Sequence, residues 1–115
     1  MRFMKNILLA ICLLVVGKAF ALEYEVLLEN DLVTVCRVKI MPQEEIGLHY
    51  DQYPQVVVAR QGGVITRLEQ DGSTTDVEFP TDVPVYRPAE TADKIHKSVN
   101  NQPGPIELII TQIKK

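Results

Sequence analysis

The chain has 115 residues, two cysteines and a formal net charge of −3 at pH 7, from 12 basic and 15 acidic side chains. A chain of this length forms one domain with one modest hydrophobic core. The acidic excess argues against nucleic acid and anionic membrane surfaces as partners, and it favours a soluble protein.

The first 21 residues have the layout of a secretory signal peptide. Arg2 and Lys5 form a basic start, residues 7–17 are continuously apolar, and Ala19-Phe20-Ala21 is a small-x-small cleavage site. The apolar stretch of 11 residues is shorter than the roughly 20 that span a bilayer. We therefore expect residues 1–21 to be removed and the mature protein to be periplasmic or secreted, without membrane association.

Cleavage would leave residues 22–115 as a single domain with a net charge of −6 and one cysteine, Cys36. This domain cannot form an internal disulfide. In the strand predicted over residues 32–40, one face holds Leu32, Thr34, Cys36, Val38 and Ile40, and the other holds Arg37 and Lys39. We therefore expect Cys36 to be a small core residue, with a redox or disulfide-linked role as the alternative.

Alternation with a period of two residues, which is typical of β-strands, dominates the mature chain. The predicted strands, in chain order, are residues 23–28, 32–40, 46–51, 55–60, 64–70, 74–79, 83–87, 94–99 and 106–113. Turn residues separate them, including Gln61-Gly62-Gly63 and the strong hairpin signal Asp71-Gly72. Eight or nine short strands at this spacing predict an all-β sandwich or barrel.

The chain contains only two histidines, and they lie in different predicted strand segments. His49 lies in Gly47-Leu48-His49-Tyr50-Asp51, and His96 begins His96-Lys97-Ser98-Val99-Asn100. If the strands close into a barrel, the two imidazoles can converge inside it. The pair then marks a pocket for a metal or a small ligand.

The order of these features resembles that of a single-domain cupin (RmlC-like jelly-roll), a double-sheet barrel of eight strands. The first cupin motif runs glycine, spacer, His-x-His, three or four residues, Glu, six residues, Gly. Here His49-Tyr50-Asp51 stands at the His-x-His positions, Gln55 at the Glu position and Gly62 at the closing glycine. The resemblance covers most of residues 32–114 and implies that residues 22–115 form one small jelly-roll barrel.

The second cupin motif ends Gly-x-x-His-x-x-x-Asn. His96 and Asn100 match it, whereas Asp93 stands at the glycine position. Tyr86-Arg87-Pro88-Ala89 resembles the segment that leads into this motif. For Asn100 we expect a structural hydrogen-bonding role rather than a catalytic one.

The resemblance implies four metal-ligand positions, and here they hold His49, Asp51, Gln55 and His96. Residues i and i+2 of a strand point to the same face, so His49 and Asp51 can both face the interior. Two imidazoles and one carboxylate make a facial triad that suits a divalent ion with open positions. Iron, manganese, nickel, copper and zinc are the candidate ions, and Gln55 would be a weak fourth oxygen ligand.

The sequence is compatible with three functions. The first is a small exported barrel that binds a divalent metal, a small ligand or both. The second is a metal-dependent dioxygenase or isomerase that uses His49, Asp51 and His96. The third is a metal-free structural or interaction module, in which both histidines are buried and neutral. A homodimer through apolar strands such as residues 56–58 or 106–110 is an additional expectation.

Three arginines, Arg60, Arg67 and Arg87, occur on three different predicted strands. One of them could bind a substrate carboxylate, because a planar guanidinium matches a carboxylate with two hydrogen bonds. The alternative is that they belong to the solvent face of the sheet.

Overall fold

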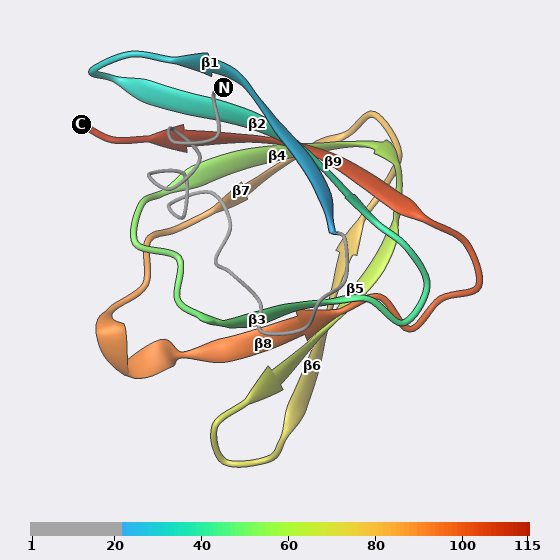
Figure 1. Ribbon diagram of the computed structural model, residues 1–115. Helices are drawn as coiled ribbons and strands as arrows, with labels where there is room; N and C mark the ends of the chain where they lie inside the picture. The colour runs from blue at the N-terminus through green and yellow to red at the C-terminus, as the bar shows by residue number, and fades with distance from the viewer. Residues whose placement is uncertain (1–21) are drawn as a thin grey trace.

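The computed structural model describes residues 22–115, which form nine strands in two antiparallel sheets (Figure 1). The strands are β1 (Glu23–Glu29), β2 (Val33–Ile40), β3 (Glu45–His49), β4 (Gln55–Gln61), β5 (Gly63–Glu69), β6 (Thr74–Phe79), β7 (Pro84–Arg87), β8 (His96–Val99) and β9 (Ile106–Ile113). A 3-10 turn, η2 (Ala92–Lys94), precedes β8. Within the described part of the chain, no helix is long and apolar enough to cross a membrane.

The two sheets contain five and four strands, in the orders β1-β2-β9-β4-β7 and β3-β8-β5-β6. From β2 onward the chain passes back and forth between the sheets, and only β5 and β6 form a hairpin within one of them. The C-terminal strand β9 lies between β2 and β4. Figure 1 shows the two sheets facing each other, with β3 and β8 below the five-stranded sheet. The predicted double-sheet jelly-roll fold is therefore confirmed.

The core lies between the sheets, where alternate residues of β2 and β9 point inward. Val38, Ile40 and Ile106 are almost fully buried. Burying such a side chain contributes about 1.5–3 kcal/mol to folding. Cys36 is also completely buried in this core, so the prediction of a small core residue is confirmed. Leu32 was expected to share the buried strand face of Cys36. It precedes β2 instead and is 56% exposed.

The segment around Gly62 is a change of sheet rather than the turn of a hairpin. β4 ends at Gln61 and β5 begins at Gly63, but the two strands belong to different sheets. A Cβ atom on Gly62 would overlap the carbonyl oxygen of Phe79 and lie 2.7 Å from the backbone nitrogen of Thr81. The close approach of these backbones explains why this position holds a glycine.

Two predicted strands differ from the observed ones by two residues at one end, and both differences border the histidines. The strand expected over residues 94–99 begins at His96, because Lys94 closes the η2 turn by donating to the Thr91 carbonyl. The strand expected over residues 46–51 ends at His49. Asp51 follows in irregular backbone, where its carbonyl accepts a hydrogen bond from the Glu90 amide.

Candidate metal centre

A cavity of about 80 Å³ lies between the two sheets and is lined by residues from both. This volume has room for several water molecules or a small organic ligand. Its apolar wall includes Ile40, Val57, Ile65, Phe79, Leu108 and Ile110. Its polar residues are His49, Asp51, Gln55, Arg67, Arg87, His96 and Ser98.

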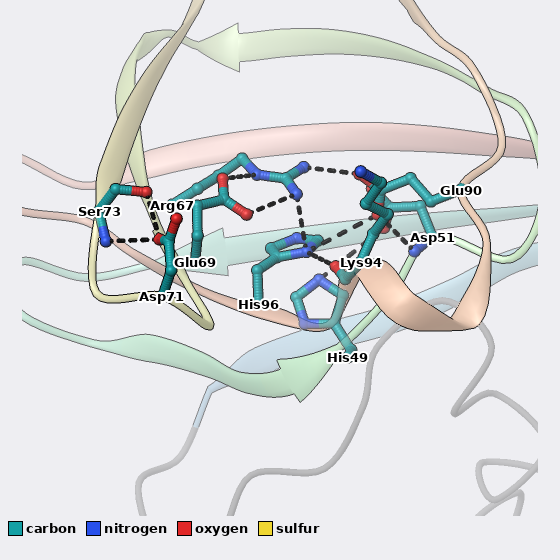
Figure 2. A network of polar contacts seen from close by, with 9 residues as sticks. All are labelled: His49, Asp51, Arg67, Glu69, Asp71, Ser73, Glu90, Lys94 and His96. Carbon is teal, nitrogen blue, oxygen red and sulfur yellow. Dashed lines mark hydrogen bonds and ion pairs between the residues drawn. The ribbon is translucent and has the colours of Figure 1, made fainter.

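His49, Asp51 and His96 meet at this cavity (Figure 2). His49 at the end of β3 is the register partner of His96 at the start of β8, and their ring centroids lie 4.4 Å apart. The Nε2 atom of His49 is 3.8 Å from Oδ1 of Asp51. One ligand atom from each of the three residues lies within 4.8 Å of the others.

This donor set fits a divalent transition metal. Nitrogen and oxygen ligands about 2.1 Å from one ion lie at most about 4.2 Å from each other. The His49–Asp51 distance of 3.8 Å already satisfies that limit, and the 4.8 Å spread of the group needs only small side-chain movements. Imidazole nitrogen with one carboxylate oxygen is a donor combination that iron, zinc, copper and nickel accept.

The fold fixes the orientation of the His49 ring. Its Nδ1 atom is 2.7 Å from the carbonyl oxygen of Gly47, so Nδ1–H donates to this oxygen. The lone pair of Nε2 then faces Asp51 and His96. Such a hydrogen bond selects the tautomer that can bind a metal. Burial lowers the pKa of His49, which favours the neutral imidazole that a metal requires.

His96 is held in the same local way and is more deeply buried, with 2% of its surface exposed. Its Nδ1 atom lies 2.9 Å from the carbonyl oxygen of Lys94, again two residues earlier in the chain. The Nη2 atom of Arg67 also lies 2.9 Å from this Nδ1 atom, and a guanidinium nitrogen can only donate. Nδ1 therefore accepts from Arg67 when the ring proton is on Nε2, and donates to the Lys94 carbonyl when Nδ1 carries the proton itself. The second tautomer leaves Nε2 free as a ligand.

Arg67 and two glutamates form a charged network behind the histidines (Figure 2). The arginine is only 8% exposed, and its nitrogens lie 3.0 Å from both Glu69 and Glu90. Burial alone would lower the pKa of Arg67, but the two carboxylates outweigh it and raise that pKa. Glu90 also accepts a hydrogen bond of 3.0 Å from the Asp51 amide. Glu90 therefore connects Asp51 to the network around His96.

The sequence did not single out Glu69 or Glu90, and it left Arg67 among three similar arginines. A signal for Arg67 was present, because it is two residues from buried Ile65 and so shares the inward face of β5. Glu90 lies in a loop, where no local periodicity marks the inward side.

The remaining predicted residues, Gln55, Asn100 and Asp93, lie in three different environments. Gln55 lies on β4 in the other sheet, is buried and lines the same cavity, so its role as a fourth ligand stays a prediction. Asn100 is completely buried and donates to the carbonyls of Ile40 and Gly104. These bonds support its predicted structural role. Asp93, at the glycine position of the motif, lies exposed in η2.

Comparison by sequence finds no matching family model and no significantly similar curated protein. Comparison by structure finds a cupin domain from Bordetella pertussis, with a TM-score of 0.73 and 21% identity, over 85% of this chain and 98% of that one. A cupin superfamily protein from Desulfitobacterium hafniense has a TM-score of 0.61 and 14% identity, over 89% and 85% of the two chains.

The polyketide cyclase RemF from Streptomyces resistomycificus is also similar, with a TM-score of 0.58 and 12% identity, over 80% of this chain and 64% of that one. These similarities show that the chain has the cupin fold, a double-stranded β-helix. The resemblance that the two histidine motifs suggested is confirmed at the level of the fold.

Proposed function

We propose that the mature domain is a small exported barrel that binds one divalent transition metal in its interior. His49 Nε2, His96 Nε2 and an Asp51 carboxylate oxygen would be the ligands, with Gln55 as a weak fourth donor. The convergence of the three residues carries the proposal. The position of each Nδ1 atom beside the carbonyl oxygen two residues earlier, which orients both rings, supports it.

A metal with three protein ligands keeps open positions and acts there as a Lewis acid toward a bound ligand. The apolar wall of the cavity would exclude water from that position, and the carboxylate of Asp51 would offset part of the ion's charge. The open positions also favour a second candidate, a metal-dependent dioxygenase or isomerase that uses the same three residues. The fold does not choose between binding and catalysis, because cupin barrels host both.

A titration of the metal-free mature domain with Co²⁺ tests the proposal, since visible absorption reports the coordination of this ion. We expect one equivalent to bind, with affinity falling about 100-fold or more in His49→Ala and in Asp51→Asn. Asp31→Asn, an exposed carboxylate outside the cavity, is the matched control.

Gln55→Ala should weaken Co²⁺ binding less than either ligand variant, because an amide oxygen is a poorer donor than a carboxylate. Equal affinity in the wild type and in His49→Ala would refute the proposed centre. Failure of the wild type to bind Co²⁺ would favour the metal-free module.

A further inference from the structure

The structure distinguishes the three arginines that the sequence left equivalent. The guanidinium of Arg67 is occupied by Glu69 and Glu90. Arg60 is exposed near the end of β4 and is absent from the cavity wall. Arg87, at the end of β7, is half-buried and lines the cavity.

Arg87 is the register partner of Gln55 across strands β7 and β4. Both residues line the cavity from the five-stranded sheet, whereas His49 and His96 come from the four-stranded sheet. Within residues 22–115, the Arg87 guanidinium forms no ion pair and no hydrogen bond. Its N–H groups are therefore available to a ligand, beside the amide of Gln55.

The charges around the cavity favour an anion once a divalent metal is bound. Asp51 is the one carboxylate that lines the cavity among the described residues, and Arg87 offsets it. Arg67 is paired with two carboxylates, Glu69 and Glu90, which together exceed its charge by one. A bound divalent metal would leave a net positive cavity with an apolar wall, which attracts a negatively charged group on a nonpolar body.

We propose that the cavity takes a small monocarboxylate with a short apolar body, and that Arg87 binds its carboxylate. A guanidinium and a carboxylate match in a planar, two-bond geometry. The apolar wall formed by residues such as Val57 and Leu108 would hold the body of the ligand. The inference rests on the proposed function for the positive charge that a bound metal adds to the cavity, and on Arg87 alone for the preference for a carboxylate.

The test compares butanoate with its neutral analogue butanamide and with butylammonium. Binding is followed by calorimetry and by amide chemical shifts at Val57 and Leu108, in both Zn²⁺-loaded and metal-free mature protein. We expect butanoate to bind about tenfold or more tightly than butanamide, and butylammonium to bind least.

Arg87→Met should remove the preference for butanoate over butanamide, because butanoate loses a charge-assisted pair and butanamide loses at most a neutral hydrogen bond. Arg60→Met, the matched exposed control, should retain the preference. Arg87→Lys should keep part of it, since the charge remains but the two-bond geometry is lost. Chemical shifts of the free variants verify that each is folded.

The inference is overturned if butanoate and butanamide bind equally, or if the preference survives in Arg87→Met. It is also overturned if no probe shifts the amide signals of the cavity residues. A wrong metal centre would give a different result, which is the loss of Zn²⁺ from the protein on dialysis. In that case the titration of the metal-free protein with butanoate and butanamide still tests the role of Arg87.

Discussion

His49 and His96 are held by the same local device, although they belong to different strands. Each Nδ1 atom contacts the carbonyl oxygen two residues earlier in the chain, from Gly47 and from Lys94. The two rings lie 4.4 Å apart at an angle of 56°. Because both imidazoles are oriented by backbone atoms, the ligand geometry is largely set before any metal binds.

Glu90 is the residue that supports the proposed ligands from behind, so its replacement tests the support directly. Glu90→Gln weakens the bond to the Asp51 amide and leaves the buried Arg67 with less compensation. We expect metal affinity to fall about tenfold, the range measured when such supporting hydrogen bonds are lost. Competition with a chelator of known affinity measures the change.

The control for this prediction is Glu45→Gln, since Glu45 forms a more exposed pair with Lys97 at 3.7 Å. Metal affinity in that variant should equal the wild-type value. An equal loss in both variants would show that the effect comes from net charge and not from the network at the site.

At the residue scale, the spacing of the motifs was enough to predict that His49, Asp51 and His96 face one cavity. It could not predict how Arg67 and Glu90 support them, because their pairing joins β5 to a loop 23 positions later in the chain. Such contacts depend on the closed barrel. The sequence alone left Arg60, Arg67 and Arg87 indistinguishable for the same reason.

At the scale of elements, the change of sheet at Gly62 shapes the barrel between β4 and β5. Gly62→Ala would place a methyl group against the backbones of Phe79 and Thr81. In the wild type, the Gly62 amide also donates to Oγ1 of Thr81 at 2.9 Å. Relieving this overlap requires a backbone shift, which costs about 1–3 kcal/mol. We expect the urea midpoint of the metal-free domain to fall accordingly, with an unchanged slope.

Gly104→Ala is the control for Gly62→Ala, because a Cβ atom at Gly104 has no neighbour within 4 Å. Its stability should stay within about 0.5 kcal/mol of the wild type. The structural account of the β4–β5 corner would be wrong if the two alanine variants were equally stable.

Alternating hydrophobicity predicted the strands well because most of them bury one face. In β2 and β9 every second residue is buried, and the predicted end of each strand is the observed one. The same pattern could not predict the order of strands. β9 lies between β2 and β4, whose residues are far from it in the chain. Local sequence does not encode the pairing of such distant strands.

At the scale of the whole molecule, the nine strands of residues 22–115 lie after the predicted cleavage site. β1 begins at Glu23, and Leu22 packs against the hydrophobic core. Removal of residues 1–21 therefore leaves every strand of the barrel in the mature chain. We predict that the exported protein begins at Leu22 and that residues 22–115 expressed alone have the same melting temperature.

N-terminal sequencing of the exported protein measures the cleavage point. An N-terminus within β1, or an uncut chain retained in the membrane fraction, would contradict the predicted export. The homodimer through apolar strands stays a prediction.

The central claim is that the two histidines and Asp51 hold a metal in the barrel. Its most direct test is elemental analysis of the natively exported mature protein, purified without a chelating tag, beside a His49→Ala, Asp51→Asn double variant. We predict close to one transition-metal ion per chain in the wild type and none in the variant. A wild type that carries no metal and takes up no iron, manganese, nickel, copper or zinc on titration would contradict it.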